Sequence, residues 1–321
     1  MDTYKHLKAP DDHVGISFDV EKREYQETLG ITDLFMLFVA LIWGINFTFV
    51  KIALSEFNPV VFNGIRLTFA SIVLIFILFI TKQGFKVPKK DIGKLVVLGI
   101  IGNSIYQLLF IYGINLTTAS NTSIIMAMSP ASVALLSSLF KHERIHWAAW
   151  VGIAFSFVGF YLVIVRQPGS FIFSLENFKG DMMIFCANLF WAVYTVFSKP
   201  LLGRITPLKW SSITLAVGTV FYLPFCVPVF SSQDFKQISF KAWAILAFSG
   251  IFALAVGYIV WYSSVKRIGN SKTVIYGNIV PIFTVIFAYI LIAEKISFWQ
   301  AVGTVIILAG VYLTRSGYRF K

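Results

Sequence analysis

The sequence predicts an all-α polytopic membrane protein with ten transmembrane helices in two inverted five-helix repeats. Of its 321 residues, 57% are apolar and only 13% are charged, whereas soluble chains carry about a quarter charged residues. Many apolar stretches are about eighteen residues long or longer with few or no charges, the length a helix needs to cross roughly 30 Å of hydrocarbon. An ordinary soluble domain is therefore excluded.

Hydropathy, together with the polar residues between the apolar stretches, places ten spans. They lie at approximately 32–54, 59–81, 91–115, 119–139, 146–165, 179–199, 210–230, 241–263, 271–291 and 297–316. The segment before the first span is polar and mixed in charge. We therefore expect residues 1–30 to form a flexible cytoplasmic tail, with no removable signal peptide.

The distribution of Lys and Arg predicts the orientation. The tail, the even-numbered loops and the C-terminal end carry most of them, whereas the odd-numbered loops carry few. The positive-inside rule then places both termini in the cytoplasm of an inner-membrane protein. The net charge of +12 does not indicate a nucleic-acid partner, because the basic residues do not cluster on one solvated face.

The chain contains an internal repeat. Asp33, Trp43, Phe49 and Lys51 recur 148 positions later as Asp181, Trp191, Phe197 and Lys199. Pro130, Glu143, Gly152, Gly159 and Tyr161 recur 151 positions later as Pro281, Glu294, Gly303, Gly310 and Tyr312. Because five spans is an odd number, the two repeats, residues 31–166 and 178–317, must insert with opposite orientations. The paired glycines predict close packing of the fifth and tenth helices on their neighbours.

Several of these residues also carry a family resemblance. The run Trp43-Gly44-Ile45-Asn46-Phe47, the Asn58-Pro59 turn followed by Arg66, and the doubled Pro, Glu, Gly, Gly pattern resemble the drug/metabolite transporter superfamily, specifically its EamA-type ten-helix branch. The resemblance covers about Thr32 to Ser316. It implies a central cavity between two five-helix repeats, alternating access, and export or exchange of small polar metabolites such as amino acids.

An inverted repeat places a substrate site near the membrane midplane, so polar and aromatic residues at mid-span are the candidates. In the third span, Asn103, Tyr106 and Gln107 share one helical face. An amide-rich face is costly in lipid, so we expect this face to point into protein or water. The candidate substrate-binding residues are Trp43, Asn46, Asn103, Tyr106, Gln107, Asn188, Trp191, Tyr258, Trp261 and Tyr276. Pro130 and Pro281 are candidate gating hinges, because proline removes a helical hydrogen bond. The alternative is that the amides and hydroxyls only join helices.

The charged residues near the spans receive structural interpretations. We expect Arg66 to reach the interface or a carbonyl rather than an anionic solute group, and Lys51 and Lys199 to anchor helix ends. Glu143 and Glu294 lie just before a following helix, whose dipole favours a carboxylate there. A carboxylate proton relay is not evident.

A metalloprotease is the sharpest rival hypothesis. His142-Glu143-Arg144-Ile145-His146 matches the H-E-x-x-H zinc pattern. The mechanism needs one continuous helix through all five residues and a third ligand, whereas these residues fill a link between two spans. The second repeat keeps the glutamate as Glu294 without either histidine, so we expect no metal.

The sequence therefore predicts a non-enzymatic transporter that moves a small polar or amphipathic metabolite, an amino acid or similar, by alternating access, with export favoured. Its expected partners are the solute and membrane lipid, with no cofactor and no nucleic acid, and it would act as a monomer or homodimer. A membrane enzyme and a passive pore or structural protein remain the alternatives.

Overall fold

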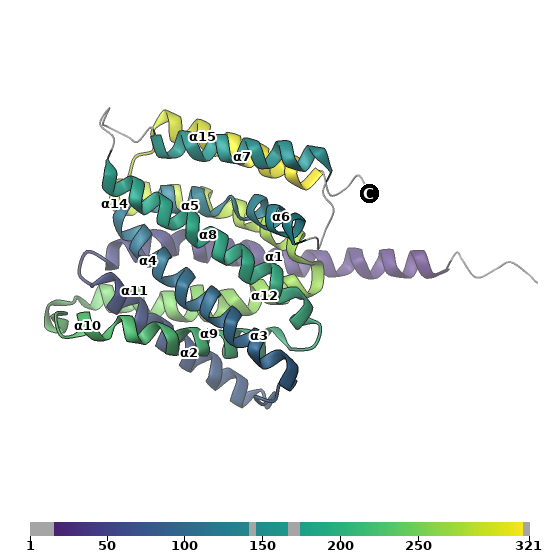
Figure 1. Ribbon diagram of the computed structural model, residues 1–321, viewed down its shortest axis with the longest axis horizontal. Helices are drawn as coiled ribbons and strands as arrows, with labels where there is room; N and C mark the ends of the chain where they lie inside the picture. Colours follow the sequence, from purple (N-terminus) through teal and green to yellow (C-terminus); the bar gives the residue numbers. More distant parts are fainter. Residues whose placement is uncertain (1–15, 141–145, 166–173, 317–321) are drawn as a thin grey trace, which may run out of the picture. The chain divides into compact units, whose positions relative to one another are not determined.

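A computed structural model describes residues 16–140, 146–165 and 174–316 (Figure 1). The chain divides into two compact units, Met1–Phe35 and Met36–Lys321, and the bundle of packed helices belongs to the second. The first half contains α1 (Ile16–Ala53), α2 (Pro59–Ile80), α3 (Lys89–Ile100), η1 (Ile101–Ile105), α4 (Tyr106–Leu116), α5 (Ala119–Met126), α6 (Ser129–Leu139) and α7 (Trp147–Val165). Because α1 begins at Ile16, it starts inside the segment expected to form a tail.

The second half repeats this order of elements. It contains α8 (Leu175–Leu202), α9 (Pro207–Tyr222), η2 (Leu223–Phe225), α10 (Val227–Phe230), η3 (Phe235–Gln237), α11 (Phe240–Phe248), η4 (Ser249–Val256), α12 (Gly257–Ile268), α13 (Asn270–Thr273), η5 (Val274–Ile279), α14 (Val280–Ile292) and α15 (Phe298–Ser316). The described residues form helices and connecting turns without a strand. This confirms the predicted all-helical class.

The lengths of the helices fit a membrane-spanning fold. Eight helices of the described chain are long and apolar enough to cross a bilayer, and Phe298–Thr314 is a shorter apolar helix. The remaining expected span, 210–230, corresponds to α9, η2 and α10, which are interrupted near Pro224 and Pro228. Large apolar side chains such as Phe79 and Val227 are about three-quarters exposed, as expected for surfaces that face lipid rather than water.

The helix α2 shows how local sequence sets a span. Asn58 caps its N-terminus, since the side-chain oxygen accepts from the backbone N–H of Val60 at 3.0 Å and of Val61 at 3.4 Å. Pro59 occupies the first helical position, where no hydrogen-bond donor is needed. The Asn-Pro pair therefore starts the helix that carries Arg66 into the bundle.

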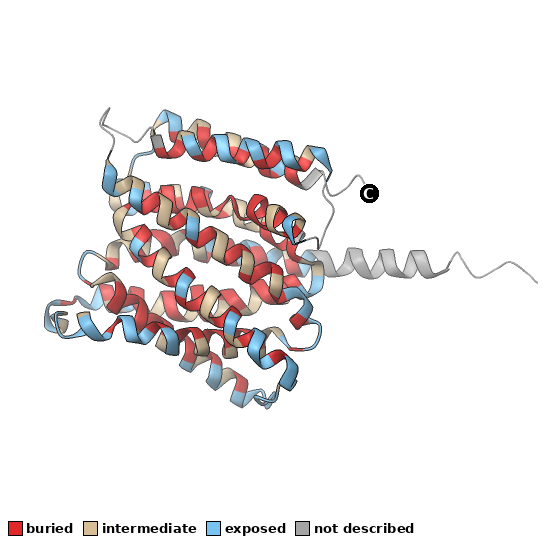
Figure 2. Cartoon of the chain, viewed as in Figure 1, coloured by how far each residue is buried: buried red, intermediate tan, exposed pale blue. Residues whose placement is uncertain are grey.

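The fifth and tenth spans, α7 and α15, pack against each other along their length (Figure 1). A methyl group on Gly152 would meet the carbonyl of Gly310, and one on Gly159 would meet the carbonyl of Gly303. Figure 2 shows buried residues along the side shared by the two helices and exposed residues along the other. The expected close packing is confirmed, and the neighbour of each helix is its own repeat mate.

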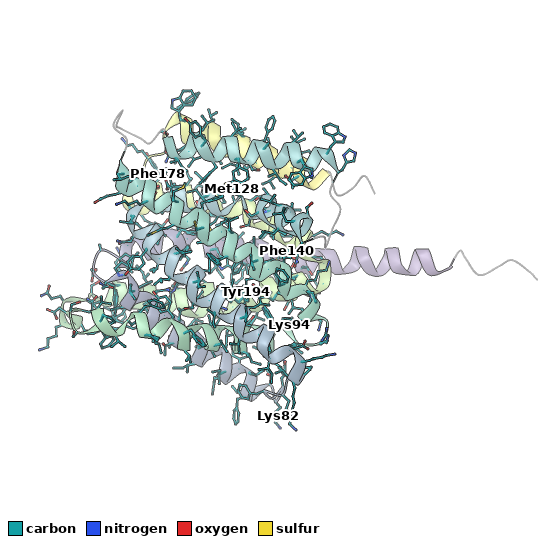
Figure 3. The ribbon with its side chains drawn as sticks, viewed as in Figure 1. Lys82, Lys94, Met128, Phe140, Phe178 and Tyr194 are labelled. Carbon is teal, nitrogen blue, oxygen red and sulfur yellow. The ribbon has the colours of Figure 1, made fainter. Side chains whose placement is uncertain are left out.

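Besides the interrupted span 210–230, four spans depart from a regular α-helix. The third and eighth spans contain the π-helical segments η1 and η4, and the ninth begins with the 3-10 segment η5. The fourth span is broken between α5 and α6, at Ala127 and Met128 (Figure 3). Such interruptions free backbone groups and are frequent at functional sites of membrane proteins.

Candidate substrate cavity

A cavity of about 70 Å³ lies inside the second unit. The residues that line it come from both halves of the chain: Trp43, Asn46, Phe47, Arg66, Tyr106, Gln107, Phe110, Ser123, Met126, Ser129, Trp191, Ala253, Leu254, Tyr258, Trp261, Gly277 and Val280. Pockets for drug-sized ligands are several times larger, roughly 300 Å³ or more. The cavity must therefore widen from this conformation before it admits a solute of several carbon atoms.

Three tryptophans form one wall of the cavity. Trp43 lies edge-on to Trp191, with ring centroids 6.2 Å apart, and its ring is 5.1 Å from that of Trp261. The Trp191 and Trp261 centroids are 5.8 Å apart. Trp43 is fixed by a hydrogen bond from its Nε1 to the carbonyl of Ala253 at 2.9 Å, within the π-helical segment η4. The wall is therefore apolar and rigidly packed.

Arg66 is the charged member of the lining. Its side chain is only 1% exposed, so the expectation that it reaches the membrane interface is wrong. Nη2 donates to Oε1 of Gln107 at 2.6 Å and Nη1 donates to the hydroxyl of Ser249 at 3.0 Å. Gln107 in turn donates from Nε2 to the hydroxyl of Tyr258 at 3.2 Å. These two partners, Gln107 and Ser249, hold the guanidinium inside the bundle. Both are on other spans, so the spacing of residues along the sequence does not predict the contacts.

Asn188 stabilises the break between α5 and α6. Its Nδ2 donates to the carbonyl of Met126 at 3.0 Å and to the hydroxyl of Ser129 at 2.8 Å, while its Oδ1 accepts from Ser132 at 2.6 Å. These bonds satisfy backbone and side-chain groups next to Pro130, which lies in the first turn of α6. Asn188 is therefore a helix-to-helix contact, and it is not among the cavity-lining residues.

Seven of the ten candidate binding residues line the cavity: Trp43, Asn46, Tyr106, Gln107, Trp191, Tyr258 and Trp261. Asn103, Asn188 and Tyr276 do not. Asn103 is buried against α9, where a methyl group on Gly218 would meet its Cβ. Tyr276 lies in η5, where it packs half-buried against the core.

The structure adds lining residues that the sequence did not single out for the site. Ser123, Met126 and Ser129 come from the broken fourth span, and Gly277 and Val280 come from the equivalent part of the ninth. Pro130 and Pro281, expected at bends, lie at the first turns of α6 and α14 directly beside these residues. The proline repeat was the available signal, but it located the breaks rather than the residues that face the cavity.

A second polar cluster lies at the end of the bundle formed by the link between α4 and α5. Lys51 Nζ donates to the carbonyls of Ile114, Asn115 and Thr117 at 3.0, 2.8 and 2.6 Å. It thus caps the C-terminus of α4, which agrees with an anchoring role at a helix end.

Glu294 also holds this link. Its carboxylate accepts from the backbone N–H of Ala119 at 3.1 Å and of Ser120 at 2.9 Å. The expectation that Glu294 caps the helix that follows it is therefore wrong, because the chain folds so that α5 of the other half presents its N-terminus instead. Glu143, the equivalent residue, lies outside the described residues.

The H-E-x-x-H motif is described only at its last residue, since 141–145 lie outside the described ranges. His146 precedes α7, and its Nδ1 accepts from the backbone N–H of Ala148 at 3.4 Å. Across the described ranges, no group of three His, Cys, Asp or Glu side chains is placed to hold a metal ion.

Comparisons with known proteins agree with this fold. The EamA-like transporter family matches residues 30–165 and again residues 178–316. "Uncharacterized transporter YyaM" of Bacillus subtilis (strain 168) is 31% identical over 88% of this chain and 92% of its own length. An "Uncharacterized transporter" of Archaeoglobus fulgidus is also 31% identical, over 88% of this chain and 96% of its own.

Two more distant proteins complete the comparison. "Probable terminal-alkyne amino-acid exporter" of Streptantibioticus cattleyicolor is 25% identical over 87% of this chain and 91% of its own length. A crystal structure of a protein with 16% identity superimposes with a TM-score of 0.65 over 89% of this chain and 97% of that chain, a likeness of fold alone. The chain is thus a membrane transporter of the inverted-repeat class rather than an enzyme. It belongs to the EamA-like transporter family.

Proposed function

We propose that this transporter exports a small polar or amphipathic metabolite from the cytoplasm by alternating access, and that the solute binds in the cavity around Trp43, Trp191 and Gln107. The observation that carries the proposal is that equivalent residues of the two repeats meet there. Trp43 is in edge contact with its repeat mate Trp191, and Gln107 of the first repeat donates to Tyr258 of the second. A site shared equally by two inverted halves is exposed to either side when the halves rock.

The broken spans supply the moving parts in this proposal. The fourth and ninth spans both touch the cavity and both lose regular helix just before Pro130 and Pro281. A proline at the first turn of a helix leaves the preceding residues without a continuous hydrogen-bond ladder. We assign the two prolines as hinges, acting between repeats 31–166 and 178–317.

The direction and the solute class draw support from one relative. The Streptantibioticus protein is named an amino-acid exporter and aligns along most of both chains. A small amphipathic metabolite also suits a cavity with aromatic walls and a few hydrogen-bonding groups. For the orientation, the excess of Lys and Arg in alternate loops supports cytoplasmic termini in the inner membrane.

Efflux from proteoliposomes tests the transport proposal even while the solute is unidentified. Vesicles containing the purified protein are loaded with a metabolite extract of cells, diluted, and the lost solutes are identified by mass spectrometry. The proposal predicts selective, saturable loss that Trp191→Ala reduces strongly while Trp299→Ala, at an exposed position on α15, does not. Non-selective loss, as from a passive pore, or no loss at all would overturn it.

Cysteine labelling tests the orientation. In a variant lacking Cys186 and Cys226, single cysteines replace Lys82, beyond the end of α2 (Figure 3), and Gln237, in the loop before α11. Both positions are exposed. An impermeant thiol reagent should label Gln237→Cys in intact spheroplasts and Lys82→Cys only after lysis. The reverse pattern would contradict the proposed orientation.

A further inference from the structure

We infer that the solute is a monoanion, a carboxylate with an apolar body and no ammonium group, and that Arg66 binds its charge. The inference rests on the proposed function, because it names the solute class of the same cavity. It follows from the balance of charge and hydrogen-bond donors around Arg66.

The charge of Arg66 is uncompensated. Arg66 is the one formally charged side chain among the lining residues, and in the described part of the chain no carboxylate pairs with it. Its partners are an amide oxygen, a hydroxyl, and the rings of Phe62 and Phe110, whose centroids lie 5.8 and 5.9 Å from its Cζ. All four are neutral. A buried charge without an opposite charge is unfavourable, so a bound anion would be stabilised.

The cavity also has an excess of hydrogen-bond donors. A guanidinium has five N–H groups, and the bonds to Gln107 and Ser249 use two of them. Nε of Arg66 has no hydrogen-bond partner, and neither does Nε1 of Trp261, although both side chains are almost fully buried and line the cavity. Buried donors are nearly always paired. A carboxylate, which only accepts hydrogen bonds, is the complementary ligand.

The walls of the cavity define the rest of the solute. Around Arg66 the walls are aromatic, from Phe47 and Phe110 to the three tryptophans, and Phe47 and Phe110 are in ring contact at 5.7 Å. Such walls favour a hydrocarbon body over a sugar or a second charged group. The solute is therefore an organic acid with an apolar body rather than an inorganic anion.

Net charge separates a monoanion from a zwitterion. A bound monocarboxylate brings the net charge of the cavity to zero. A zwitterionic amino acid leaves its ammonium group uncompensated, because the lining offers that group rings, hydroxyls and the unpaired Oδ1 of Asn46 but no carboxylate. The lining thus discriminates by net charge, even between solutes with the same carbon skeleton.

Three probes with one skeleton test this in the wild-type protein: 4-methylpentanoate, its amide 4-methylpentanamide, and leucine. Binding at pH 7 is followed by the fluorescence of the cavity tryptophans. We expect the carboxylate to bind at least about tenfold tighter than the amide and than leucine. Leucine binding as tightly as the carboxylate, an amide that binds equally well, or no binding of any probe would overturn the inference.

Variants of Arg66 test its role. Arg66→Gln should bind the carboxylate and the amide equally, and Arg66→Lys should restore part of the preference for the carboxylate. Arg267→Gln, at an exposed position near the end of α12, is the matched control and should keep the wild-type preference. A folded Arg66→Gln protein that still prefers the carboxylate would contradict the assignment. If this variant fails to fold, the three probes on the wild-type protein still decide the solute class.

The inference and the proposed function fail in distinguishable ways. Selective efflux of zwitterionic or neutral solutes, with no preference for the carboxylate, would contradict the monoanion inference but not the transporter function. Absence of any selective efflux, together with tight binding of the carboxylate, would support an anion-binding site and contradict the transport proposal.

Discussion

Gln107 of the first repeat and Tyr258 of the second are joined by a hydrogen bond of 3.2 Å from the glutamine Nε2 to the tyrosine hydroxyl. Trp43 and Trp191, displaced by 148 positions, are also in contact. In an inverted repeat, residues on the pseudo-twofold axis meet their own mates. The axis therefore passes through the cavity, and each half contributes one side of it.

Loss of the Tyr258 hydroxyl should destabilise the protein. In Tyr258→Phe, the buried Nε2 of Gln107 loses its acceptor, which costs about 1–3 kcal/mol, and the apparent melting temperature in detergent should fall. Tyr289→Phe removes a hydroxyl from an exposed position on α14 and should leave the melting temperature unchanged. Equal melting temperatures for the two variants would show that the bond contributes nothing.

The glycine contacts between α7 and α15 should tolerate no side chain. Gly310→Ala places a methyl group against the carbonyl of Gly152 and the backbone N of Ser156, and overpacking of this kind costs about 1–3 kcal/mol. Gly93→Ala on α3 meets nothing within 4 Å and should be neutral or stabilising, because alanine favours helix. We expect the Gly310 variant alone to melt at a lower temperature. A stable Gly310→Ala protein would mean that the two helices can separate at little cost.

Glu294 should stabilise the link between α4 and α5 through its charge. Glu294→Gln keeps the side-chain length but removes the carboxylate at the N-terminus of α5, a loss of about 0.5–2 kcal/mol. Glu176→Gln, exposed in the first turn of α8, is the control. Hydrogen exchange of residues 117–121 should accelerate in the Glu294 variant and not in the control. Unchanged exchange would rule out the capping role.

Glu56 should make stability depend on pH in the acid range. Its carboxylate accepts from the backbone N–H of Ser239 at 2.6 Å and from the Ser239 hydroxyl at 2.9 Å, and these bonds lower the pKa of Glu56 below its ordinary value. Because the folded-state pKa is the lower one, the contribution is present above the ordinary pKa and disappears as the pH falls through the folded-state pKa. The difference in melting temperature between the wild type and Glu56→Gln should therefore begin to shrink as the pH falls below the ordinary glutamate pKa of about 4.3, and it should reach zero below the folded-state pKa. A difference that persists there would mean that the carboxylate charge is not the cause.

The spans were predictable from the sequence because membrane insertion depends on local apolar length. The helix α2, for example, begins at Pro59, as the Asn-Pro turn predicts. The repeat was also visible in the sequence, since Gly152 and Gly159 recur 151 positions later as Gly303 and Gly310. Both the spans and the repeat depend only on the order of residues along the chain, which tertiary packing does not alter.

The wrong predictions for individual site residues have a common physical cause. Arg66 is buried because Gln107 and Ser249, on other spans, accept its hydrogen bonds, and Glu294 caps a helix of the opposite repeat. Asn103 packs against Gly218 of α9 and does not line the cavity. Each depends on contacts between distant segments, so spacing within one helix does not predict it.

Alternating access at the central cavity is tested most directly at one half-buried residue that lines it. Met126, on the broken fourth span, is replaced by cysteine in a variant lacking Cys186 and Cys226, and a charged impermeant thiol reagent is added to oriented vesicles from one side at a time. We expect labelling from each side in turn, with no reagent crossing the membrane and with protection by bound 4-methylpentanoate. Labelling from one side only, under every condition, would contradict alternating access.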